Sequence, residues 1–394
     1  MFRNLLALIV LVGLIYVSFN SERATSVEKK KEDQFSAEAT LPYLQRIARE
    51  VHPIGSLENM KVRDYLYNTL RNEGLEVRLE SGYINSSWKP TYMQMAYVEN
   101  IVAVLKGSDP NAKKVLIAAH YDSVFEGPGA ADDGYAVACM IETAKMLKAT
   151  PRKNDVIFLI TDGEEMGLLG AKYHAENNDL SDIGIMLNFE ARGNEGPGIA
   201  FEFSDKNAWL ISEMAKVSKR PIANSLSFEI YKRMPNATDY TVFKNKGVAG
   251  VNYAFIDGFS YYHNPADNIE NLSMESVQHT GENMYLMAKH FANYDFAETG
   301  EGNASFFNFY GNLIHYSSGL DIFILILVML LLGFTFFRLL RAKEVTMKSL
   351  APLLITSASA EIGSAKHATA RAAPKNLLVT SYILLQARVW GGLR

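Results

Sequence analysis

The sequence is almost free of cysteine, with Cys139 as the single one among 394 residues. An internal disulfide is therefore impossible, and a metal site built from cysteine thiolates is excluded. An excess of charge of either sign is also missing, because the formal net charge is −4 at pH 7. Nucleic acid and other polyanions are not indicated as partners. The sequence contains no internal repeat.

Long apolar runs are scarce, and two stand apart from the rest of the chain. The first covers residues 5–19 and follows Arg3. It predicts a signal anchor or a cleaved signal peptide over residues 1–22, and the lack of a clear cleavage site after it favours the anchor. The lysine-rich stretch that follows, residues 23–36, is predicted to be a charged linker.

The second apolar run covers residues 322–337 and predicts a transmembrane helix over residues 320–340. Arg338 and Arg341 follow the run closely, whereas residues 302–321 contain no lysine or arginine. Basic residues near the end of a span tend to stay in the cytoplasm. We therefore expect the preceding domain on the extracytoplasmic side, which is periplasmic or lumenal. An anchored first run and a cleaved one both agree with this location.

Between these runs, strand-like and helix-like segments alternate. This alternation predicts an α/β fold with a mostly parallel mixed sheet and helices on both faces. The expected strands are 75–81, 92–105, 115–119, 155–161, 183–189, 196–203, 225–231 and 250–255. The expected helices are 37–50, 59–73, 135–148, 166–177, 206–219, 238–245 and 274–293. Residues 299–319 are predicted to be a linker, and residues 341–394 a tail to which we assign no structure.

Four of the strands lead to a histidine or a carboxylate. Ligands of open α/β sheets bind at the carboxyl edge of the strands, so these side chains are expected to gather there. Two histidines with several carboxylates form a ligand set that suits zinc and is large enough for two ions. The residues concerned are His120 and Asp122, Glu164 and Glu165, Glu190, and His263.

An acidic pair, Asp132-Asp133, ends a loop rich in glycine and proline just before the helix at 135–148. Either carboxylate can bridge two ions, because each has two oxygens. Of the neighbouring Glu164 and Glu165, one can bind metal while the other acts as a general base. Taken alone, the glutamate pair could instead simply favour the dipole of the helix that follows it.

Five motifs, taken in order, resemble the M28 family of zinc metallopeptidases over roughly residues 40–295. The similarity is greatest to the membrane-anchored branch related to endoplasmic reticulum metallopeptidase 1, which two further motifs match. The two are His52-Pro-x-Gly-Ser56 and Pro235-Asn-x-Thr-Asp239. The five are His120-x-Asp122, Gly127-Pro-Gly-Ala-x-Asp132-Asp133, Asp162-Gly-Glu164-Glu165, Asn188-Phe-Glu190 and Tyr262-His263-x-Pro-x-Asp267.

The resemblance implies a peptidase domain over residues 37–298 with the three-layer α/β/α sandwich of zinc aminopeptidases. It also implies two zinc ions bridged by Asp132. In that arrangement His120 and Glu190 complete one site, and Glu165 and His263 complete the other. Glu190 stands where many relatives have aspartate, and Asn264 and Asn268 replace the usual threonines, but no ligand is lost.

The resemblance further assigns Glu164 as the general base and Tyr262 as a stabiliser of the oxyanion. Asp122 and Asp267 would hold the ligands in place, and the peptide bond between Asp132 and Asp133 would be cis. The implied function is that of a membrane-anchored exopeptidase that acts on peptides, with release of N-terminal residues preferred over carboxypeptidase or dipeptidase activity.

Two alternatives remain at this stage. The first is an acyltransferase similar to glutaminyl cyclase, which shares the fold but uses one zinc ion. The presence of both His120 and His263 argues against it. The second is an inactive, receptor-like ectodomain on the same fold. Such proteins lose metal ligands, and none is missing from the motifs of this chain.

Overall fold

The computed structural model describes residues 33–89 and 92–342, together with residues 24–27 and positions 9, 12, 13 and 16. Most of the predicted segment 1–22, much of the predicted linker 23–36 and nearly all of the tail 341–394 lie outside the described residues. The chain forms two units, Met1–Ser318 and Gly319–Arg394. The first unit contains the sheet, and the second contains the apolar helix.

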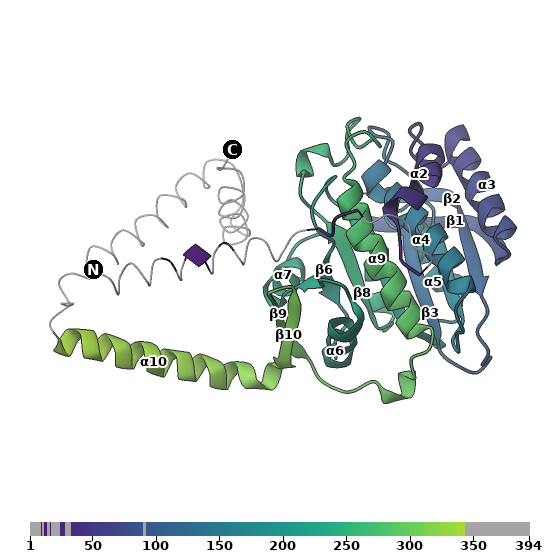
Figure 1. Cartoon of the computed structure of the whole chain (residues 1–394). Helices are drawn as coiled ribbons and strands as arrows, with labels where there is room; N and C mark the ends of the chain where they lie inside the picture. Colours follow the sequence, from purple (N-terminus) through teal and green to yellow (C-terminus); the bar gives the residue numbers. More distant parts are fainter. Residues whose placement is uncertain are drawn as a thin grey trace. The chain divides into compact units, whose positions relative to one another are not determined.

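An eight-stranded mixed sheet forms the centre of the first unit (Figure 1). Its strand order is β1-β2-β4-β3-β5-β8-β6-β7. The central strands β4, β3, β5 and β8 pair in parallel, as β6 and β7 do, and the other neighbours are antiparallel. The strands are β1 (Glu76–Lys89), β2 (Tyr92–Leu105), β3 (Lys114–His120), β4 (Val156–Thr161), β5 (Ile183–Ala191), β6 (Ile199–Phe203), β7 (Ile222–Ala223) and β8 (Gly250–Phe255).

The central strands are buried on both faces, which explains why their sequences are mostly apolar. In β3, Val115 and Ile117 belong to one hydrophobic core and Leu116 to another. Since side chains alternate along a strand, the two cores lie on opposite faces of the sheet. The helices that contribute to the first core include α2 (Leu41–Ile47), α3 (Leu57–Asn72), α4 (Tyr135–Lys148), α6 (Ala208–Val217) and α9 (Met274–Phe291). Those of the second are α5 (Leu169–Asn177) and α8 (Asp239–Asn245).

The predicted α/β fold with helices on both faces is therefore confirmed, and Figure 1 shows α4 and α9 side by side across one face. The bounds of α4 agree with the predicted 135–148. The first helix is shorter than predicted, because residues Ala37–Thr40 form a 3-10 turn before α2. Strand β1 is longer than predicted, because it continues beyond residue 81 in a hairpin with β2.

The strand predicted at residues 225–231 is wrong, because Ser225–Tyr231 form a helix, α7. Polar and apolar residues alternate in this segment, which is the pattern of a strand. The side chain of Asn224 accepts a hydrogen bond from the backbone N–H of Ser227 at 2.8 Å, which caps a helix start. Phe228 is buried on one side of this helix while Leu226 remains exposed.

The predicted linker 299–319 contains a two-stranded antiparallel sheet that was not expected, formed by β9 (Ala304–Phe309) and β10 (Asn312–Ser317). Phe306 is buried against Phe203 and Phe228, with the ring centroids of Phe306 and Phe203 5.1 Å apart. Because this burial attaches the hairpin to the first unit, the ordered domain extends beyond the predicted end at residue 298.

The second unit contains one long apolar helix, α10 (Asp321–Arg341), close to the predicted span 320–340. Its side chains are mostly exposed and apolar, and within the described residues none of them is buried. Ser318–Arg341 is long and apolar enough to cross a bilayer by length and composition. The described residues that precede it include no second helix of this kind.

Candidate metal centre

The predicted ligands meet at the carboxyl edge of the parallel strands. His120 is the last residue of β3, and Glu190 lies near the end of the neighbouring strand β5. The turn after β4 places Glu164 and Glu165 beside them. This turn depends on Gly163, whose φ of 73° lies in the left-handed region that favours glycine.

Asp132 lies between the two histidines. Its Oδ1 is 3.2 Å from Nε2 of His120, and its Oδ2 is 3.1 Å from Nε2 of His263. Each oxygen of one buried carboxylate therefore faces a different imidazole. This is the arrangement expected of a carboxylate that bridges two ions.

A further carboxylate accompanies each histidine. Oε2 of Glu190 lies 3.7 Å from Nε2 of His120, and Oε1 of Glu165 lies 3.1 Å from Nε2 of His263. The five side chains thus form two groups, each with one histidine and one glutamate, that share Asp132. These are the two groups that the motifs implied, and their role as zinc ligands stays a prediction.

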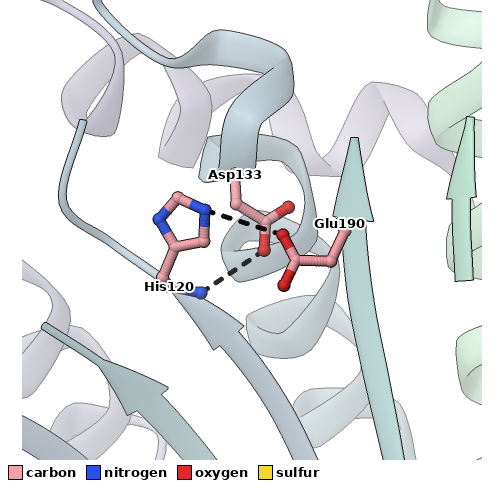
Figure 2. A group of neighbouring side chains, drawn as sticks. All are labelled: His120, Asp133 and Glu190. Atoms are coloured by element: carbon pink, nitrogen blue, oxygen red, sulfur yellow. Dashed lines mark hydrogen bonds and ion pairs between the residues drawn. The ribbon is translucent and has the colours of Figure 1, made fainter. Parts of the chain in front are cut away.

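Asp133 is a further candidate ligand, and Figure 2 shows it with His120 and Glu190. One oxygen of Asp133 accepts a hydrogen bond from the backbone N–H of His120 at 3.3 Å, and the other is buried without a hydrogen-bond partner. Candidate ligand atoms of His120, Asp133 and Glu190 lie within 4.8 Å of one another, as do those of His120, Asp132 and Glu165. Asp132, however, is the aspartate that contacts the side chains of both histidines.

Zinc fits this set of donors, because neutral imidazoles and carboxylates are ligands that zinc accepts. Burial raises the pKa of Glu190 to about 8 and that of Glu165 to about 7. The pKa of Asp133 is raised well above its ordinary value by burial and by the charge of Glu190. Carboxylates gathered in this way repel one another, and a divalent cation would balance their charge.

Asp122 connects the two sides of the centre. Its carboxylate accepts hydrogen bonds from the backbone N–H groups of Glu164 at 3.0 Å and Glu165 at 3.3 Å. Nδ1 of His120 lies 2.9 Å from the main-chain oxygen of Asp122 and 3.5 Å from Oδ1 of the same residue. One residue therefore orients the imidazole and holds the glutamate turn.

Asp267 holds the loop that presents Asp132. Its two carboxylate oxygens accept hydrogen bonds from the backbone N–H groups of Ala131 at 2.7 Å and Asp132 at 3.1 Å. The peptide bond between Asp132 and Asp133 is cis, as the resemblance implied.

Tyr262 stacks on His263, with ring centroids 3.7 Å apart. Burial raises the pKa of its phenol above the ordinary value, as do the charges of Asp132 and Glu165. The Tyr262 phenol thus stays neutral and can act as a hydrogen-bond donor close to the centre. The side chain of Glu164 belongs to neither candidate metal group, although burial and the charge of Glu190 raise its pKa well above the ordinary value.

Two neighbours of the centre were not assigned a role from the sequence. Asp239 is fully buried and accepts a hydrogen bond from the Thr161 hydroxyl at the end of β4. Asp239 ends the motif that begins at Pro235, and this motif was the sequence signal that could have identified it.

Arg192 lies over the ring of Tyr262, 5.3 Å from its centroid. Its position two residues after Glu190 was the signal that could have identified it, because side chains two apart on a strand share a face.

The sequence model described as "Peptidase family M28" matches residues 100–288. The chain is 28% identical over 286 residues to a vacuolar membrane protease of Candida albicans, covering 71% of this chain and 33% of the relative. It is 26% identical over 269 residues to endoplasmic reticulum metallopeptidase 1 of Mus musculus, covering 66% of this chain and 30% of the relative. The chain thus spans about a third of the length of these relatives.

Two solved structures have a similar fold. An aminopeptidase from Aneurinibacillus sp. strain AM-1 has a TM-score of 0.51 at 13% identity, covering 66% of this chain and 93% of the other. A glutaminyl cyclase of Porphyromonas gingivalis has a TM-score of 0.50 at 21% identity, covering 65% of this chain and 99% of the other. At such identities the likeness shows the fold alone, which does not distinguish a peptidase from a cyclase.

Proposed function

We propose that this chain, which belongs to peptidase family M28, is a zinc-dependent exopeptidase that releases N-terminal residues from peptides. The observation that supports the proposal most directly is the position of Asp132, with one carboxylate oxygen on each of two histidines. A site that can hold two ions is suited to hydrolysis, because it requires no serine or cysteine nucleophile. The aminopeptidase-type α/β/α sandwich is the corresponding proposal for the fold.

In this proposal the five ligands are Asp132 between the ions, His120 and Glu190 on one side, and Glu165 and His263 on the other. When bound, the zinc ions would lower the pKa of a water molecule and polarise the carbonyl group that is attacked. Asp122 and Asp267 position these ligands through the hydrogen bonds described above.

The acid–base chemistry is assigned to Glu164. It takes a proton from the attacking water and later delivers a proton to the amine that leaves. A carboxylate that is no metal ligand can accept a proton in the first step and return it in the second. Tyr262 donates its phenolic hydrogen to the oxyanion that forms at the substrate carbonyl.

Release of an N-terminal residue requires recognition of a free α-amino group. The carboxylates of the centre provide an anionic surrounding for an ammonium group next to the scissile bond. We expect peptides with a free N-terminus to be cleaved at least 10-fold faster than their N-acetylated forms, since hydrogen bonds to charged groups contribute about 1.5–3 kcal/mol. Chromatography of the products would measure both rates, and equal or faster cleavage of the acetylated peptides would disprove the aminopeptidase assignment alone.

We also propose that α10 anchors the chain in a membrane with the peptidase domain on the periplasmic or lumenal side. The support is the length and composition of Ser318–Arg341 and the basic residues at its carboxyl end. Two relatives are named as membrane or endoplasmic reticulum proteins, which agrees with a membrane location.

Protease treatment of intact cells or sealed microsomes tests this topology with a tag on the C-terminus. The tag should survive when protease acts from the non-cytoplasmic side, and it should be lost once detergent opens the membrane. If protease acting from the non-cytoplasmic side degraded the tag while the peptidase domain stayed protected, the orientation would be the reverse of the proposed one. In sealed microsomes protease acts from the cytoplasmic side, so there the proposed orientation predicts loss of the tag and protection of the peptidase domain.

A further inference from the structure

Arg192 directly follows β5, two residues after the candidate ligand Glu190. Its backbone N–H donates to the carbonyl of Phe255 at 3.0 Å, which fixes the start of the loop beside the end of β8. The half-buried side chain of Arg192 reaches the ring of Tyr262, which stacks on the candidate ligand His263.

The guanidinium rests on aromatic rings rather than on carboxylates. It lies 5.3 Å from the ring centroid of Tyr262 and 5.9 Å from that of Phe259. Tyr262 in turn stacks on His263, so one aromatic ring separates Arg192 from a candidate ligand. Ring contacts stabilise the charge of an arginine but leave its N–H donors without acceptors.

One donor of Arg192 is unused within the described part of the chain, because Nε is buried and has no hydrogen-bond partner there. Arginine presents its donors as a planar fork that matches a carboxylate. A buried donor without an acceptor costs free energy, which a bound anionic group would recover.

Tyr231 supplies a second unused donor near the same place. Its hydroxyl is buried without a hydrogen-bond partner among the described residues, and its ring packs edge-on against Phe201. Burial raises the pKa of the Tyr231 phenol, the charges of Glu202, Glu190 and Glu164 raise it further, and the charge of Arg192 lowers it.

We propose that Arg192, assisted by the Tyr231 hydroxyl, binds a carboxylate of the substrate on the carboxyl side of the scissile bond. This inference rests on the proposed function and defines its substrate class. The carboxylate has two sources: the free C-terminus of a dipeptide, or the side chain of an acidic residue in a longer peptide. The guanidinium lies one ring beyond His263, so a carboxylate bound there would belong to a residue close to the scissile bond.

Four substrates distinguish the sources in an assay of the full-length chain in detergent with zinc. Ala-Leu is compared with Ala-Leu amide, and Ala-Glu amide with Ala-Gln amide. A preference within the first pair identifies the free C-terminus, and one within the second pair identifies the acidic side chain. We expect the wild-type chain to favour the acid in one of these pairs by about 10- to 100-fold in kcat/KM.

The variant Arg192→Met should remove that preference by slowing cleavage of the acid alone, and Arg192→Lys should restore part of it. Tyr231→Phe should weaken the preference by a smaller factor. Arg71→Met is the matched control, because Arg71 is exposed in the last turn of α3 and should leave all four rates unchanged.

Three results would overturn the inference. A wild-type chain that discriminates within neither pair has no carboxylate subsite. Equal slowing of all four substrates by both Arg192 variants would mean that the residue only supports the ring of Tyr262. A wild-type chain that cleaves none of the four, and no longer peptide with a free N-terminus either, would refute the peptidase proposal itself, a failure that is distinct from the first two.

Discussion

Replacing Glu164 by glutamine is expected to lower kcat by about 10²–10⁴-fold or more while the metal content stays unchanged. The amide cannot accept a proton from water, but it has nearly the same shape as the carboxylic acid it replaces. Glu164 belongs to neither candidate metal group, so the ligands remain in place. Steady-state kinetics with a free-N-terminus peptide, together with metal analysis of the same preparation, measures both effects.

The neighbouring variant Glu165→Gln is the control for this experiment. Oε1 of Glu165 lies 3.1 Å from Nε2 of His263, so the substitution changes a candidate ligand and should weaken metal retention. Both residues share the same turn and the same anchor at Asp122. If Glu164→Gln retained full activity, or if the two phenotypes were exchanged, the assignment of base and ligand would be wrong.

Two zinc ions per chain are expected in protein prepared without chelator, and Asp132→Asn should reduce the content of both. Asp132 is the side chain whose oxygens face both histidines, at 3.2 and 3.1 Å. An amide offers one oxygen and no negative charge, so it bridges two cations poorly. Loss of the bridge should abolish activity, because the attacking water would no longer be held and acidified between two ions.

Elemental analysis measures the zinc content of each variant. Assays after zinc is removed and returned measure the activity that depends on it. His279→Gln is a useful comparison, because His279 is buried away from the motif residues and contacts the backbone of Gly198 and Arg220. The control variant should keep its zinc. A firm value of one zinc per chain, unchanged when zinc is added, would instead favour the cyclase-like alternative.

The fold was predictable in segments whose sequence pattern agrees with their burial in the folded chain. The strands β3, β4 and β5 are buried on both faces, so their sequences are mostly apolar runs with a polar residue at or next to the carboxyl end. Helix α4 begins directly after a glycine and an acidic pair, and its predicted bounds were confirmed. In these segments the hydrophobic period and the turn residues indicate the same structure.

The errors occurred where local patterns conflict with one another. Residues 225–231 alternate like a strand, yet the cap at Asn224 and burial of Phe228 favour helix α7. The hairpin at residues 304–317 was not predicted, although its strands contain aromatic residues that are common in strands. Its pairing is stabilised by Phe306 against Phe203, a contact between residues about a hundred positions apart in the chain.

The sequence by itself determined the class of chemistry, since the order and spacing of five motifs identify the ligand types, and apolar strands deliver them to one edge. Tertiary structure alone decided which atoms face one another. Asp132 and His263 are 131 positions apart, and Asp267 holds the backbone of Ala131 across 136 positions. Only the folded chain places Asp132 between both histidines, moves Asp133 toward His120 and Glu190, and leaves the donors of Arg192 beside Tyr262. Distances of this kind depend on how the strands pair and how loops close over them, and a linear pattern does not contain that information.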